Sequence, residues 1–101
     1  MKTIELLTVV GLSIDDHIKR VQKNSVRVKG EDWPCPLCGK PVNPNTAKHW
    51  IHLVEGGGKL GHIEETNFEE CADLGWHPVG SDCAKKVPKG YKSSDSKLSL
   101  A

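Results

Sequence analysis

Two cysteines separated by two residues are the part of this sequence best suited to chemistry. They lie in the motif Cys35-Pro36-Leu37-Cys38-Gly39, and a tight turn of this kind can direct two sulfur atoms at one metal ion. A thioredoxin-type redox pair has the same spacing but normally begins a helix, which Gly39, Pro41 and Pro44 disfavour here. The motif therefore predicts a metal site rather than a redox pair or two inert buried thiols.

Further ligands are expected because structural zinc usually takes four protein ligands. Cys83 is the third candidate, since Ser81 is expected to cap a short helix whose first turn would stabilise a Cys83 thiolate. The fourth position is open between His52, on a predicted strand, and Cys71, on the apolar side of a predicted helix. His49 would face away from His52 on that strand, so at most one of the two would bind. The cofactor expected is one structural Zn²⁺.

Hydrophobic periodicity and helix-boundary signals place the elements that would position these ligands. Strands are expected over residues 1–10, 25–28, 48–54 and 59–63, the last two forming a hairpin around three glycines. Helices are expected from Ile14 past Val21 with Ser13 as the N-cap, over residues 67–74, and from Ser81 to Val87. The pattern predicts an α+β fold.

Composition explains why a metal would be needed. The chain has 101 residues, 37% hydrophobic and only 5% aromatic, and a small domain with a thin core usually depends on disulfides or a metal. The first twelve residues lack the features of a secretory signal, and no stretch approaches ~18 apolar residues. We therefore expect a cytoplasmic protein with reduced thiols that favour a metal.

Three motifs also carry a resemblance to a known group of proteins. They are Cys35-Pro36-Leu37-Cys38-Gly39-Lys40-Pro41-Val42, Trp50-Ile51-His52-Leu53 and Gly75-Trp76-His77-Pro78-Val79-Gly80-Ser81-Asp82-Cys83-Ala84-Lys85-Lys86. Together they resemble small, mostly uncharacterised treble-clef-like zinc-finger proteins of phages and prophages, in which a knuckle, a hairpin and a helix surround the metal. The resemblance covers residues 33–88 and implies Cys35, Cys38 and Cys83 as ligands. It favours His52 as the fourth ligand and does not include Cys71.

The domain organisation follows from these elements. Residues 1–30 are expected to form a strand-helix-strand extension packed on the core, residues 31–88 the zinc-binding domain, and residues 89–101 a disordered tail rich in Ser and Lys. Charge follows a similar division. The net charge of +1 conceals +3 in residues 1–30, −6 in residues 31–82 and +4 in residues 83–101.

An acidic centre suits docking on a basic partner better than contact with phosphates. We therefore predict a protein-interaction adaptor or modulator of a host factor, cytosolic in the host if phage-encoded, with no enzymatic activity, membrane contact or small-molecule substrate. The alternative is a nucleic-acid-binding zinc finger that uses the basic ends, chiefly Arg20, Lys23, Arg27, Lys29, Lys85 and Lys86. A treble-clef nuclease, with His49 or His52 as its catalytic histidine, is a further alternative, although no residue is assigned a catalytic role.

Overall fold

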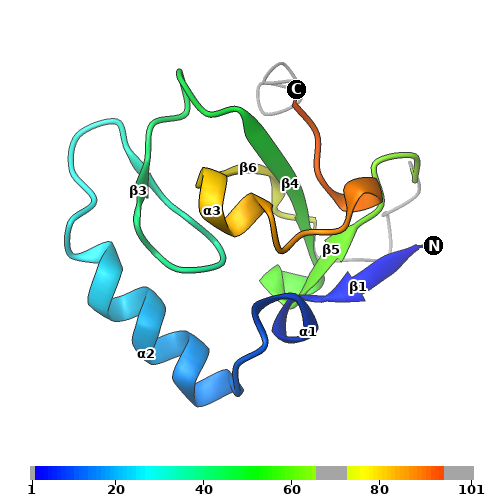
Figure 1. The fold of residues 1–101 in the computed structure, drawn as a ribbon, viewed down its shortest axis with the longest axis horizontal. Helices are drawn as coiled ribbons and strands as arrows, with labels where there is room; N and C mark the ends of the chain where they lie inside the picture. Colours follow the sequence, from blue (N-terminus) through cyan, green and yellow to red (C-terminus); the bar gives the residue numbers. More distant parts are fainter. Residues whose placement is uncertain (1, 66–72, 95–101) are drawn as a thin grey trace.

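The larger of two sheets is built around one long strand in the computed structural model, which describes residues 2–65 and 73–94. All neighbouring strands in this sheet are antiparallel, and its long strand is buried along most of its length. Helices and a separate two-stranded sheet complete an α+β fold (Figure 1). The strand order is β1 (Thr3–Glu5), β5 (Lys59–Gly61), β4 (His49–Val54) and β6 (Gly75–Val79).

The predicted hairpin is confirmed as β4 and β5. Leu53 lies opposite Leu60, and both side chains are buried. The turn between the strands is a short 3₁₀ segment, Glu55–Gly57, in which all three residues have positive φ. Two consecutive glycines tolerate this conformation without steric cost, so the glycine triplet makes the tight return of the chain feasible.

Strand β6 was not predicted from the sequence, since it contains Pro78 and proline disfavours the interior of a strand. The strand lies at the edge of the sheet, where Pro78 is opposite Trp50. A proline lacks the N–H that a central strand must donate, but an edge strand needs partners on one side only. Strand β6 leads through Gly80 into α3 (Ser81–Ala84).

The N-terminal segment is more helical than the pattern indicated. Only β1 is extended, and the apolar run continues as α1 (Leu6–Val10), which ends at Gly11 with φ 68°. Helix α2 (Ile14–Ser25) begins as predicted, with the Ser13 side chain accepting a 3.2 Å hydrogen bond from the Asp16 amide.

The strand predicted over residues 25–28 is wrong. The amides of Arg27 and Val28 donate to the carbonyls of Asn24 and Ser25, and Val26 is 76% exposed. Local turns therefore satisfy these backbone groups, and the segment needs no partner strand. The helix predicted over residues 67–74 falls largely outside the described residues.

The structure also differs from the prediction at residues 89–94, which were expected to begin a disordered tail. They form a 3₁₀ turn, η2 (Lys89–Tyr91), and a bridge in which Ser93 and Trp50 exchange backbone hydrogen bonds of 2.7 and 2.8 Å. Tyr91 packs against the core, and the Lys92 ammonium donates to the Ala84 carbonyl. The Tyr91 ring and the pairing of Ser93 with Trp50 thus hold residues 89–94 against the fold.

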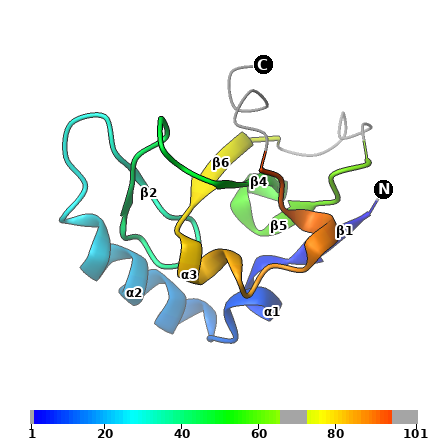
Figure 2. The same ribbon diagram turned by 45° about the horizontal axis from the view of Figure 1, so that its top comes forward.

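The core joins the large sheet to the cysteine region. Leu6, Ile51, Leu60 and Val79 belong to the same buried cluster as Leu37, Val87 and three cysteines. Helix α2 lies along one side of the molecule and contributes no buried residue (Figure 2).

In the described part of the chain, no helix combines the length and hydrophobicity that a membrane crossing would require.

A close backbone approach fixes α2 against the cysteine motif. The Asn24 side-chain amide donates a 2.7 Å hydrogen bond to the Cys38 carbonyl. A Cβ atom added to Gly39, which has φ +83°, would lie 2.4 Å from the Val21 carbonyl oxygen. Backbone atoms cannot yield as a flexible side chain can, so this crossing requires glycine.

We expect Gly39→Ala to lower the free energy of unfolding by about 2 kcal/mol or more, through the clash with α2 and the positive φ. Urea unfolding of the parent and the variant measures this difference. Gly58→Ala is the matched control, because its added Cβ would meet the nearest atom at 3.5 Å. Equal losses in the two variants would contradict the proposed clash.

Candidate metal centre

The Cys-x-x-Cys motif forms a knuckle between the two strands of the smaller sheet. These strands, β2 (Trp33–Pro34) and β3 (Pro41–Val42), pair antiparallel. Between them the Gly39 amide donates to the Cys35 carbonyl at 2.7 Å, and the Cys35 amide donates to the Lys40 carbonyl at 2.9 Å. The turn is closed by its own backbone, so both thiols project from one rigid loop.

Helix α3 brings the third thiol to the knuckle. The helix lies between the knuckle and the large sheet (Figure 1). Ser81 does not cap it as predicted, because Ser81 is itself the first helical residue and the N-cap is Gly80. The Gly80 carbonyl accepts from the Ala84 amide at 2.9 Å. The direction of β6, rather than a serine cap, therefore sets the position of Cys83.

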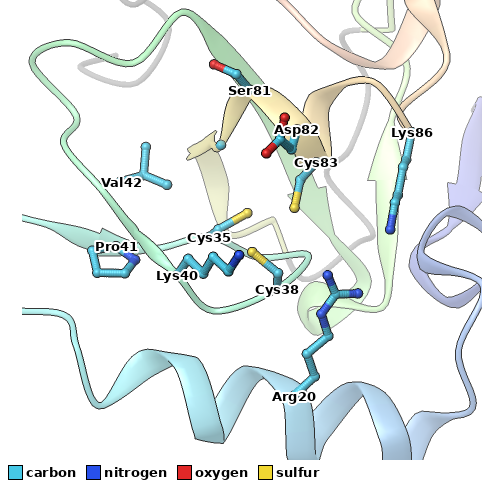
Figure 3. Close-up of a pocket in the computed structure, with 11 residues that line it drawn as sticks. Arg20, Cys35, Cys38, Lys40, Pro41, Val42, Ser81, Asp82, Cys83 and Lys86 are labelled. Carbon is cyan, nitrogen blue, oxygen red and sulfur yellow. The ribbon is translucent and has the colours of Figure 1, made fainter.

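The three sulfur atoms lie within 4.8 Å of one another. Figure 3 shows Cys35 and Cys38 on the knuckle with their sulfurs turned toward that of Cys83. All three side chains are buried. Three thiolates on rigid supports form a soft donor set of the kind that holds Zn²⁺ in structural sites. The structure thus brings together the three cysteines that the sequence analysis named as ligands.

Hydrogen bonding within the cluster prepares one thiolate. The contact with the Cys83 thiol lowers the pKa of Cys35 to about 5, against the opposing effect of burial, and backbone amides of Gly80, Leu37 and Cys38 lower it further. The same contact raises the pKa of Cys83. The hydrogen bond between the two sulfurs thus favours a thiolate within this cluster, and the thiolate is the form that binds a metal.

His52 lies in a different set of contacts. Its Nε2 is 2.7 Å from Asp73 Oδ1, and its ring stacks on Trp76 with 5.0 Å between centroids. Among the described residues, the group of close ligand atoms contains the three thiols and not His52. Cys71 lies outside the described residues. The identity of the fourth ligand stays a prediction.

The contact with His52 also affects Asp73. Burial alone would raise the pKa of this carboxyl, but a 2.8 Å hydrogen bond from the Gly75 amide and the contact with His52 together lower it. The lowered pKa means that the carboxylate stabilises the fold above its unfolded pKa of about 3.8. Asp73 thereby ties the segment before β6 to β4.

A charged pocket opens beside the thiols. Its volume is about 240 Å³, and its lining includes the three cysteines and the side chains of Arg20, Lys40 and Lys86. Two of these cations, Arg20 and Lys86, are among the predicted nucleic-acid-binding residues. The other predicted residues, Lys23, Arg27, Lys29 and Lys85, are not part of the lining. Lys40 was missed, although its place directly after the knuckle was a usable signal.

Comparison of the chain with protein-family models and with solved structures finds no match. The assignment of a metal centre therefore rests on the chemistry and geometry of the three thiols.

Replacing Asp73 tests its contribution to stability. At pH 7 we expect Asp73→Asn to lower the free energy of unfolding by up to about 1 kcal/mol, since the carboxylate is partly exposed. The difference from the parent should shrink as the pH falls through the lowered pKa, because the parent carboxyl then becomes neutral as well. Urea unfolding at several pH values measures it, with exposed Glu31→Gln as the control. A difference that does not shrink once the parent carboxyl is neutral would refute the assignment.

Proposed function

We propose that this protein is a small metal-binding module in which Cys35, Cys38 and Cys83 hold one structural Zn²⁺. The observation that carries the proposal is the convergence of three buried sulfurs within 4.8 Å from two separate parts of the chain. A metal there would link the knuckle to α3 and add folding free energy to a thin core. The chain order of knuckle, hairpin and ligand-bearing helix supports a treble-clef-like arrangement.

Metal analysis of the purified protein tests the proposal. We expect about one zinc ion per chain in the parent and none in Cys35→Ser or Cys83→Ser, because two remaining thiolates bind too weakly. Removal of the metal by a chelator should lower the melting temperature of the parent and leave that of the Cys83→Ser variant unchanged. A parent without metal, whose thiols all react freely with a thiol reagent, would overturn the proposal.

The fourth ligand can be identified in the same measurements. His52 and Cys71 are the candidates, and His52→Ala and Cys71→Ser remove them one at a time. Loss of zinc in one variant alone names the ligand. Since His52 contacts Asp73 and Trp76 rather than the thiols, we expect His52→Ala to retain its zinc.

We further propose that the module acts by binding a partner protein. Ile14 and Ile18 on α2 are 59% and 45% exposed, and Ile18 borders an apolar hollow of about 260 Å³. Apolar surface of this kind beside a pocket is typical of protein-binding sites. The acidic character of residues 31–82 suits a basic partner, and the resemblance to phage proteins makes a host protein the expected one.

Affinity capture tests this second proposal. The tagged parent should retain one protein in stoichiometric amount, and Ile18→Gln should reduce the recovery about fivefold or more if the isoleucine enters the interface. Lys19→Gln, the neighbouring exposed position on the same helix, is the control and should leave recovery unchanged. Capture that is equally strong with both variants, or absent with the parent, would refute a role for this surface.

A further inference from the structure

We propose that the pocket beside the thiols binds the phosphate group of a small ligand. The inference rests on the proposed metal centre, which would form one wall of the pocket. Three cations from three separate segments surround the same hollow: Arg20 from α2, Lys40 from the knuckle and Lys86 from the turn after α3. In Figure 3 the Arg20 side chain rises from α2 and the Lys86 side chain descends from the turn after α3, so that their charged ends lie on the same side of the three sulfurs.

These cations are available to a ligand. Within residues 2–65 and 73–94, no ion pair or side-chain hydrogen bond involves Arg20, Lys40 or Lys86. The one carboxylate in the lining, Asp82, lies 3.9 Å from the Lys85 ammonium and is fully exposed. The pocket therefore presents an excess of positive charge to any group that enters it.

The negative charge of the metal centre alone does not offset the positive charge of the three cations. A Zn²⁺ ion with three thiolates has a formal charge of −1, and with four thiolates −2. The three cations exceed the combined charge of a three-thiolate centre and the Asp82 carboxylate, and they balance that of a four-thiolate centre and Asp82. The pocket between them has a volume of about 240 Å³, which leaves space for a ligand. Cations packed directly on the sulfurs would leave no such space.

Phosphate is the group that fits these donors. It carries −1 to −2 charges near pH 7 and offers several acceptor oxygens. Arginine binds phosphate oxygens in a forked geometry, and lysine adds point charges. Arg20 and Lys86 are far apart in sequence, on opposite sides of the acidic centre. Their convergence on one pocket explains how a chain with little net charge can offer a local anion site.

The test is an NMR titration of the zinc-loaded, ¹⁵N-labelled protein with inorganic phosphate at constant ionic strength. Lys40 and Gly80 line the pocket. Their amide resonances should shift, and the shifts should saturate as phosphate is added. Arg20→Gln, Lys40→Gln and Lys86→Gln should each weaken binding about tenfold or more, because each removes a charge-assisted contact. Lys23, on the same helix as Arg20, and Lys29 both lie outside the lining. Lys23→Gln and Lys29→Gln are the controls and should change binding less than about twofold.

Two further arms identify the source of the phosphate. The same titration is repeated with a dinucleotide that has a 5′-phosphate and with one that has a 5′-hydroxyl. Weaker binding of the 5′-hydroxyl form shows that the terminal phosphate is the group bound. Tighter binding of the phosphorylated dinucleotide than of inorganic phosphate indicates a nucleotide ligand, whereas equal binding indicates free phosphate. Shifts no larger than those caused by chloride overturn the inference, as do equal losses of phosphate affinity in the pocket and control variants.

Zinc content is measured on the same samples. One zinc per chain without a phosphate response refutes this inference alone, whereas absence of zinc refutes the proposed metal centre.

Discussion

The burial of three thiol groups at one point is the constraint on which the rest of this structure depends. Cys35 and Cys38 come from a closed turn, and Cys83 comes from a helix that follows the edge strand of the large sheet. A buried thiol can act as a small apolar side chain, but three in mutual contact are also a donor set for a soft metal ion. The cluster therefore belongs to the core and to the candidate site at once.

Backbone geometry, more than side-chain volume, holds this cluster in place. Gly39 allows α2 to cross the knuckle at a distance that no other residue would permit. Pro78 confines β6 to the edge of the sheet, and β6 ends where α3 must begin to place Cys83 against the knuckle. In a chain with few large apolar residues, such fixed approaches do part of the work that a larger core would do. A metal ion would close the same arrangement covalently.

Helix α2 borders two pockets. It contributes Arg20 to the charged pocket beside the thiols, and its exposed Ile18 borders a separate apolar hollow. No residue of this helix is fully buried, so its surface is not required for the core alone. The amphipathic pattern that predicts the helix also distributes these two surfaces. Under the two proposals, this helix would take part in binding both the phosphate ligand and the partner protein.

Local chemistry in the sequence was sufficient for the Cys-x-x-Cys knuckle, the Ser13 cap and the β4–β5 hairpin, because short-range spacing and turn preferences determine them. The local reason given for Cys83, a Ser81 cap, was wrong, since Gly80 is the N-cap and β6 positions the helix. At residues 25–28 the alternating pattern suggested a strand, but the Arg27 and Val28 amides bond to carbonyls within the same segment. Local chemistry was insufficient for β6 and for the bridge formed by residues 89–94, since each depends on whether a strand edge elsewhere is free to pair. The contact of His52 with Asp73 has the same origin. The convergence of Arg20, Lys40 and Lys86 was decided only by tertiary structure, because charges distant in the chain become neighbours only when the backbone between them has folded.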